Sequence, residues 1–300
     1  MYNRLNKSTL NPGAGLAVLI GGYLFFLCLL SFASEWLLPR FENMQKGLRI
    51  IYIFQAVFVF IIPALMASVV TTRLPARLLC IERRPAPIPV LLTVMVMLVS
   101  IPAMNLIIKW NAGISLPESM HGLEEWMRNL ESSAEDTINI LIGSHTVGNL
   151  IMSVLIIGVL AGFSEELFFR GAMQRILSEM RLGAHGAIWL TAIIFSALHM
   201  QFFGFFPRLI LGLLFGYILY WSKSLWMPIV AHIFNNSLAC IVSWCQNKTI
   251  SEAEVVPEGP DIAYALCSAL ITVFALVVLY RKLRRSNKMK NETENSEKIV

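Results

Sequence analysis

The residues Glu165-Glu166-Leu167-Phe168-Phe169-Arg170 follow a run, 147–163, in which almost every residue is apolar or small. A run of about 20 such residues is typical of a helix that crosses a membrane. Acidic side chains inside such a helix cost about 2.5–3.5 kcal/mol each on insertion scales, so their presence indicates a functional site. This stretch therefore predicts a membrane helix that carries two carboxylates and an arginine close together.

The composition of the whole chain agrees with a membrane protein. Of its 300 residues, 56% are hydrophobic and only 14% are charged, and the mean hydropathy is +0.66. Soluble domains contain about 25% charged residues. The net charge of +5 does not indicate nucleic-acid binding, because the basic residues lie in short segments between apolar runs. The five cysteines form no CxxC pair, which argues against a disulfide framework or a cysteine-ligated zinc site.

Apolar segments of membrane-spanning length recur along the chain. We expect an all-α, polytopic membrane protein with about eight transmembrane helices, near 14–34, 50–71, 88–108, 147–168, 185–203, 206–222, 225–245 and 261–280. Between the fifth and sixth segments there is almost no connection, only Gly204-Phe205. We also expect a helix or a simple surface connector over 116–140, on the outer side of the membrane.

Charged residues in the connections predict the orientation of the chain. The segments 72–87, 175–181 and 281–290 are rich in Arg and Lys, whereas 109–146 and 246–260 are rich in Glu and Asp. Basic connections lie in the cytoplasm, so both termini are predicted to be cytoplasmic. This divides the chain into N-terminal helices and an extracytoplasmic loop (1–146), a core (147–245), a last span (246–285) and a disordered cytoplasmic tail (286–300).

Helix geometry distinguishes the two adjacent glutamates. Glu166 and Arg170 are four residues apart with the acid first, which is the favoured order for an ion pair on a helix. Glu165 is turned by about 100° from Glu166 and need not share that partner. A free carboxylate in an apolar setting can act as a general base. The alternative, a charged cluster where the helix leaves the membrane, stays open at this point.

Two further polar groups occur in later apolar runs. His199 ends the sequence Phe195-Ser196-Ala197-Leu198-His199, and His232 and Asn236 are four residues apart on one face of a helix. His232 and Asn236 could donate two hydrogen bonds to one oxyanion, or they could hold packed helices together. His199 could equally be a helix-end residue. GxSxG and HExxH are both absent, which argues against serine chemistry and excludes a thermolysin-like zinc helix.

Together these residues resemble the CAAX protease and bacteriocin-processing (CPBP, or ABI) family of intramembrane endopeptidases. The family pattern EExxxR, FxxxH and HxxxN is matched, in this order, by Glu165-Glu166…Arg170, Phe195…His199 and His232…Asn236. The flanking residues agree as well: Gly171, Gly212, Gly216, Leu225 and Trp226. The resemblance covers about 160–240.

The resemblance implies a peptide hydrolase with a cavity open to the cytoplasm and a protein or peptide substrate presented at the lipid bilayer. Glu165 and His199 would activate water, His232 and Asn236 would stabilise the oxyanion, and Glu166 and Arg170 would support the site. Zinc held by Glu165, His199 and His232 is the alternative to a mechanism without metal, and the sequence does not decide between them. A bacterial plasma membrane is favoured, since no signal peptide or retention motif is visible.

A single site requires His199 and His232 to lie at a similar depth in the membrane. At 1.5 Å per residue, His199 lies about 22 Å along its helix from Ala184, whereas His232 lies only about 10 Å from Leu225. A shared site therefore requires the fifth helix to start deeper, to tilt or to end early in a re-entrant segment near 200–207. Other functions consistent with the sequence are a non-catalytic bacteriocin-immunity or scaffold protein of the same fold, and, less favoured, a proton-coupled transporter.

Overall fold

The computed structural model describes residues 11–249 and 262–297, and every regular element among them is a helix. Within these described ranges, seven helical segments are long and apolar enough to cross a membrane, as expected of an integral membrane protein: Pro12–Arg40, Met44–Thr71, Pro87–Ala112, Val147–Glu179, Phe202–Ser222, Trp226–Gln246 and Ile262–Ser286. The all-α polytopic fold predicted from the sequence is thus confirmed.

Several of these segments consist of consecutive helical elements. The first segment consists of α1 (Pro12–Leu37) and a short 3-10 turn. The second joins α2 (Met44–Phe54), η2 (Gln55–Ile61) and α3 (Ile62–Thr71) in one run. The central segment joins α7 (Val147–Ser153), η4 (Val154–Leu160), α8 (Ala161–Glu166), η5 (Leu167–Met173) and α9 (Gln174–Glu179). In both runs the η elements are π-helical, a form that often occurs near functional sites.

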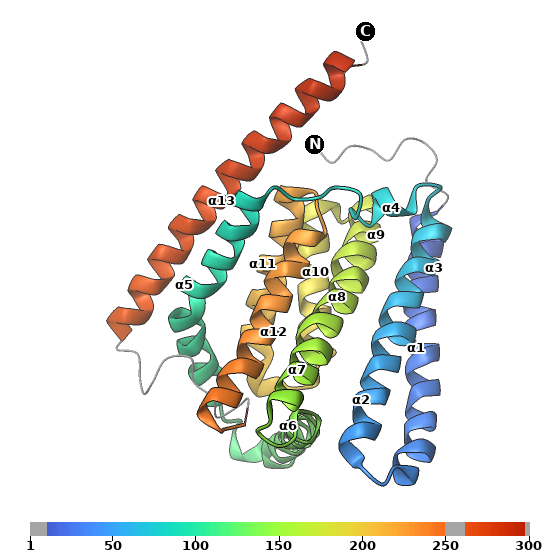
Figure 1. Ribbon diagram of the computed structural model, residues 1–300, viewed down its shortest axis with the longest axis vertical. Helices are drawn as coiled ribbons and strands as arrows, with labels where there is room; N and C mark the ends of the chain where they lie inside the picture. Colours follow the sequence, from blue (N-terminus) through green and yellow to red (C-terminus); the bar gives the residue numbers. More distant parts are fainter. Residues whose placement is uncertain (1–10, 250–261, 298–300) are drawn as a thin grey trace.

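The other helices complete the array in Figure 1, with α4 (Pro75–Leu78), α5 (Pro87–Ala112), α6 (His121–Ile142), α10 (Gly183–Ala197), η6 (Phe202–Gly204), α11 (Phe205–Ser222), α12 (Trp226–Gln246) and α13 (Ile262–Glu297). When the shorter α10 is counted with the seven long segments, successive helices alternate in direction. The start of α1 and the end of α13 lie at the same end as α4 and α9. The described ends of the chain are therefore on one side, as predicted; that this side is cytoplasmic stays a prediction from the charge pattern.

The fifth predicted span differs from the structure in length. It was expected over 185–203, but α10 ends at Ala197 and is shorter than the seven long segments. At this end of the helix the backbone N–H groups of His199 and Met200 donate to the carbonyl oxygens three residues earlier, those of Ser196 and Ala197. Met200 then adopts a left-handed conformation, with φ of 54°, so the chain turns back into η6. Of the three alternatives for a shared site, a deeper start, a tilt or an early end, the structure shows that the helix ends early.

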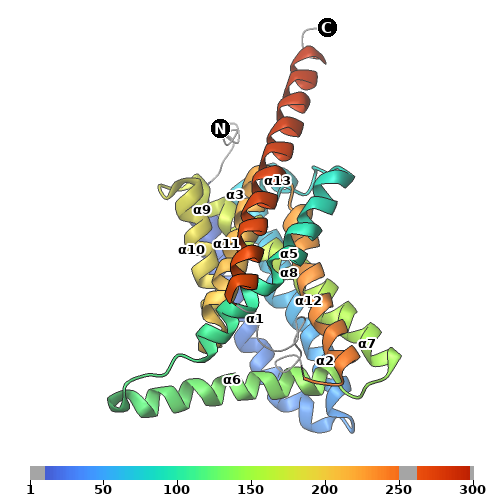
Figure 2. The same cartoon turned by 90° about the vertical axis from the view of Figure 1, so that its left-hand side faces the viewer.

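The helix α6 lies across the end of the array opposite α4 (Figure 2). The sequence left two alternatives for 116–140, a helix on the outer surface or the favoured simple connector, and α6 occupies most of that range. It is more than a connector, because Trp126 packs on Phe202 with ring centroids 5.7 Å apart and the guanidinium of Arg128 lies 4.2 Å from the Phe203 ring centroid.

The tail 286–300 was predicted to be disordered. In the structure, α13 continues to Glu297. The residues 287–297 contain neither proline nor glycine and include several good helix formers. The last three residues of that tail, and residues 250–260 of the second acidic loop, lie outside the described residues.

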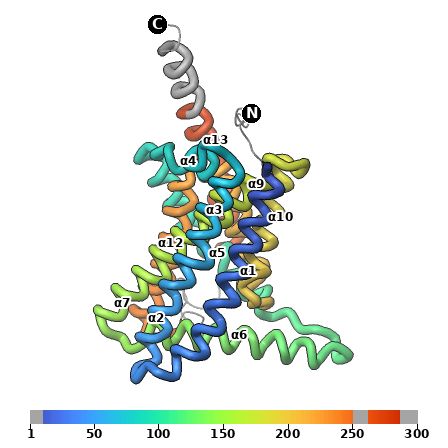
Figure 3. The backbone as a smooth tube through the Cα atoms, turned by 90° about the vertical axis from the view of Figure 1, so that its right-hand side faces the viewer, coloured from blue at the N-terminus to red at the C-terminus, as the bar shows by residue number. Residues whose placement is uncertain are grey.

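The largest apolar core surrounds the middle of the central segment. It includes Phe168 and Phe169 of η5, Leu79 after α4, Phe195 of α10 and Ile229 of α12. The helices α1 and α3 lie side by side and cover this core on one side (Figure 3). The polar doublet 165–166 is therefore held by helices from both halves of the chain.

Candidate active site

Glu166 and Arg170 form the buried ion pair that their spacing predicts. Both side chains are fully buried, and Nη1 of Arg170 donates to Oε1 of Glu166 at 2.8 Å. Nη2 of Arg170 donates to the backbone oxygen of Gly212 at 3.3 Å. Three aromatic rings surround the guanidinium carbon at 4.4, 5.4 and 5.9 Å from their centroids: Phe195, Phe215 and Phe169. Such a pair needs complete packing, because the loss of one partner leaves an uncompensated buried charge.

His232 also binds Glu166, a contact that the spacing within each motif does not reveal. Nδ1 of His232 lies 2.8 Å from Oε1 of Glu166. An ionised carboxylate only accepts hydrogen bonds, so Nδ1 carries a proton and donates it. The other ring nitrogen, Nε2, lies 3.9 Å from Oε2 of Glu165. Glu166 thus fixes the imidazole while Nε2 faces the second carboxylate, whose side chain is 17% exposed.

A glycine allows this contact between two helices. A Cβ atom at Gly162 would lie 3.1 Å from the backbone nitrogen of Ile233 and 3.3 Å from its Cα. Because Gly162 has no side chain, α8 and α12 approach closely, as small residues allow in membrane helices. Glu165 and Glu166 follow three and four residues later, about one helical turn, and His232 adjoins Ile233. The close approach therefore brings the carboxylates and the imidazole together.

His199 joins the same group from the end of α10. Its Nδ1 lies 2.8 Å from the backbone oxygen of Phe195, and since a carbonyl only accepts, Nδ1 carries the proton. In the neutral ring, Nε2 then has a lone pair that can accept from water. The Phe195 ring contacts both His199 and His232, with centroid distances of 4.9 and 6.0 Å. Since His232 also bonds to Glu166, all three motifs meet in one region.

This region coincides with a match to known proteins. Residues 147–238 match the family described as Rce1-like, type II CAAX prenyl endopeptidase. They belong to the CAAX protease family. The protein YpbD of Bacillus subtilis (strain 168), itself uncharacterized, is 28% identical over 95 residues, which make up 30% of this chain and 46% of that protein. The chain thus matches less than half of that relative's length. No solved structure was found to match it.

Asn236, the last residue of the CAAX protease motifs, lies one turn beyond His232 on α12. Its Nδ2 donates to the backbone oxygen of Ile157 in η4 at 3.1 Å, and its Oδ1 accepts from Asn235 at 3.3 Å. These bonds fix the orientation of the amide. One of its two N–H groups is engaged by Ile157, which leaves the other for a ligand.

The turn after His199 is held by helices outside the family match. Asn111 at the end of α5 is buried; its Nδ2 donates to the Phe202 oxygen at 3.3 Å, and its Oδ1 accepts from the Phe206 nitrogen at 2.9 Å. From α6, Oε2 of Glu131 accepts from the Phe203 nitrogen at 3.1 Å. The sequence shows no motif for these residues. Their contacts with the turn that follows His199 make them candidates for positioning it.

Other side chains near Glu165 also come from outside the motifs. The charge of Glu165 acts on Tyr23 of α1, Tyr52 of α2 and Arg208 of α11. The Tyr23 ring packs on Phe168, with centroids 5.3 Å apart. No sequence signal distinguishes these residues from ordinary aromatic or basic residues of membrane helices, and only the fold brings them to the site.

The zinc alternative requires Glu165, His199 and His232 as three ligands around one ion. Among the described residues, no group of three or more His, Cys, Asp or Glu side chains lies close enough together to hold a metal ion. The donor set as arranged here does not fit a three-ligand zinc site.

Proposed function

We propose that this protein is an intramembrane endopeptidase that hydrolyses peptide bonds of membrane-associated or lipidated proteins, using water activated by a glutamate and a histidine. The observation that carries the proposal is the position of His232 between the two glutamates, 2.8 Å from Glu166 and 3.9 Å from Glu165. One carboxylate orients the imidazole and the other remains available for chemistry. This division of roles is what a general-base hydrolase requires.

In the proposed mechanism, water binds between the carboxylate of Glu165 and the Nε2 lone pair of His199. Glu165 takes a proton as the water oxygen attacks the carbonyl carbon of the substrate. The resulting oxyanion accepts hydrogen bonds from Nε2–H of protonated His232 and from the remaining amide N–H of Asn236. The proton on Glu165 then passes to the amide nitrogen, the C–N bond breaks, and an amine and a carboxylic acid leave.

The two glutamates lie at the two ring nitrogens of His232, which suits an imidazole that donates from both nitrogens in this role. The contact at 2.8 Å is a hydrogen bond to an ionised, fully buried carboxylate, and such bonds are stronger than those between neutral groups. Arg170 forms a buried ion pair with the same Glu166. Glu166 and Arg170 are thus positioning residues, whereas Glu165, His199, His232 and Asn236 contact the reacting atoms.

The surroundings of the site support a substrate that reaches it through the lipid bilayer. The central segment and α12 are both apolar enough to span the membrane, and Glu165 lies within the central segment. A cytoplasm-facing opening and a location in a bacterial plasma membrane are part of this proposal. They rest on the charge pattern of the connections and on the relative in Bacillus subtilis.

A comparison of membrane proteomes tests the function. Membranes that contain the wild-type protein should show new protein N- or C-termini that are absent with Glu165→Gln, and a candidate substrate should be cleaved by the purified wild-type protein alone. A prenylated and an unprenylated form of each substrate would establish whether the lipid is needed. Identical termini in both membranes, with both proteins folded, would favour the non-catalytic immunity or scaffold protein.

A further inference from the structure

The ring of Phe215 on α11 stacks on the imidazole of His232. The ring centroids are 5.1 Å apart and the ring planes form an angle of 28°, within the range of about 4.5–7 Å that aromatic pairs prefer. Phe195 contacts the same imidazole at nearly a right angle, with centroids 6.0 Å apart. Phe195 belongs to the second motif, whereas Phe215 belongs to none of the three. Phe215 is therefore the ring that lies along the plane of the imidazole.

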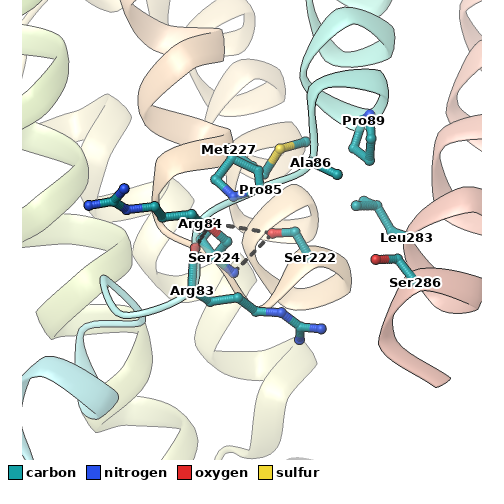
Figure 4. Close-up of a pocket in the computed structure, with 10 residues that line it drawn as sticks. All are labelled: Arg83, Arg84, Pro85, Ala86, Pro89, Ser222, Ser224, Met227, Leu283 and Ser286. Atoms are coloured by element: carbon teal, nitrogen blue, oxygen red, sulfur yellow. Dashed lines mark hydrogen bonds between the residues drawn. The ribbon is translucent and has the colours of Figure 1, made fainter. Parts of the chain in front are cut away.

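The short connection between α11 and α12 places Phe215 opposite His232. Phe215 lies seven residues before Ser222, the last residue of α11, and α12 begins six residues before His232. At 1.5 Å per residue these separations are about 10 and 9 Å, so the two rings meet at the same height. Figure 4 shows the hydrogen bonds that fix this connection. The Ser222 hydroxyl donates to the Ser224 backbone oxygen at 3.1 Å, and the Ser224 hydroxyl donates to the Arg83 backbone oxygen.

Side chains of the central segment hold α11 on both sides of Phe215. Nη2 of Arg170 donates to the backbone oxygen of Gly212 at 3.3 Å. Nε2 of Gln174, a buried residue, donates to the backbone oxygen of Gly216 at 3.2 Å. A Cβ atom at Gly216 would lie only 2.9 Å from Oε1 of Gln174, so the lack of a side chain allows this approach. The two bonds fix α11 against the central segment, and with it the direction of the Phe215 side chain.

The ring of Phe215 is enclosed by other parts of the fold. It is 1% exposed and belongs to a buried cluster with Met97 of α5. The guanidinium carbon of Arg170 lies 5.4 Å from its centroid. The ring thus contacts both side chains that donate to Oε1 of Glu166, those of Arg170 and His232. A ring packed on all sides in this way keeps one orientation.

We propose that Phe215 is a positioning residue for the reaction: its ring fixes the plane of the His232 imidazole, which Glu166 anchors at Nδ1. One hydrogen bond at Nδ1 leaves the imidazole free to tilt about that bond, and a stacked ring opposes the tilt. With both contacts, Nε2 stays directed toward Glu165, 3.9 Å away. A reactive group needs such support from its neighbours to hold its geometry. The inference rests on the proposed function, in which Nε2 of His232 donates to the oxyanion.

Kinetics of the purified full-length protein test this role, with a substrate that the wild-type protein cleaves. Phe215→Leu keeps an apolar side chain but removes the ring, and Phe215→Tyr keeps the ring. Phe168→Leu is the matched control, because Phe168 is also 1% exposed and its ring contacts are with Tyr23, Phe60 and Phe169. Thermal unfolding in detergent should show similar losses of stability in the two leucine variants.

The activities of these variants should differ even where their stabilities agree. Displacement of a catalytic group by about 1 Å can cost about 100-fold in rate. We therefore expect kcat to fall by about ten- to hundredfold in Phe215→Leu, with a smaller change in KM. Phe215→Tyr should keep a higher kcat, and Phe168→Leu should change kcat much less. Equal falls of kcat in the two leucine variants would overturn the proposal, since the loss of packing alone would then explain both.

Nuclear magnetic resonance of the histidine rings tests the contact without substrate. An aromatic ring stacked on an imidazole shifts the imidazole proton signals upfield, and the signal of His232 is the one absent from His232→Gln. We expect this signal to move downfield in Phe215→Leu but not in Phe168→Leu, and an unchanged signal in Phe215→Leu would overturn the proposal. Wild-type protein that cleaves no substrate would count against the proposed function, whereas the His232 signal would still decide whether Phe215 orients this ring.

Discussion

Nδ1 of His232 lies 2.8 Å from Oε1 of Glu166, although 66 residues separate them in the chain. The same carboxylate oxygen accepts from Arg170 at 2.8 Å. One buried glutamate therefore balances a buried arginine and orients an imidazole. The first and third motifs are in this way parts of a single unit, and Glu165 is left beside the second nitrogen of His232.

The two glutamates should respond differently to the same substitution. Glu165→Gln removes the proposed base, and we expect turnover to fall by at least about 100-fold with little change in unfolding temperature. Glu166→Gln leaves Arg170 as an uncompensated buried cation, so we expect it to lose activity and also about 3–5 kcal/mol of stability. Peptidase assays and thermal unfolding in detergent check both. Equal stability of the two variants would contradict the assigned roles.

Gly162 should control the distance between the carboxylates and His232. Gly162→Leu places a side chain against the backbone of Ile233, where even a Cβ atom is only 3.1 Å from the nitrogen. We expect α8 and α12 to separate and activity to be lost. Gly148→Leu is the matched control on α7, because a Cβ atom there meets nothing within 4 Å. Similar activity in the two variants would mean that this close approach is not required.

Asn111 should affect catalysis from a position outside the family match. Asn111→Ala removes both of its hydrogen bonds to the turn 202–206, which follows His199. Displacement of a catalytic group by about 1 Å can cost about 100-fold in rate, so we expect a drop in kcat of about ten- to hundredfold with a smaller change in KM. Asn129→Ala, an exposed position on α6, should behave like the wild-type protein. An unchanged kcat would show that the turn is held without Asn111.

Lys223 should make stability depend on pH. Its pKa is lowered to about 8 in the folded protein, by burial first and then by Arg175, against about 10.4 in an unfolded chain. Between these values the unfolded chain binds more protons at this residue, so stability rises with pH. The unfavourable contribution is complete below pH 8 and is relieved toward pH 10.4. Lys223→Gln should therefore unfold at a higher temperature at pH 7, with a shallower rise above pH 8. Parallel curves for both proteins would contradict this.

Much of the fold could be predicted because it depends on local properties of the chain. Apolar runs of spanning length predicted the long helices, and i,i+4 spacing predicted the pair of Glu166 and Arg170. The fifth span was predicted too long, since hydropathy alone does not show the reversal at Met200. The tail after 286 was expected to be disordered, but α13 continues to Glu297.

The sequence by itself determined the membrane class, the order of the helices and the ion pair of Glu166 with Arg170. Only the tertiary structure decided that Glu166 also binds His232 and that Asn111 holds the turn after His199. The physical reason is the separation along the chain of the residues that make each contact. Helical periodicity places residues three or four positions apart on one face, whereas contacts between distant segments depend on how closely their helices can pack, here through Gly162.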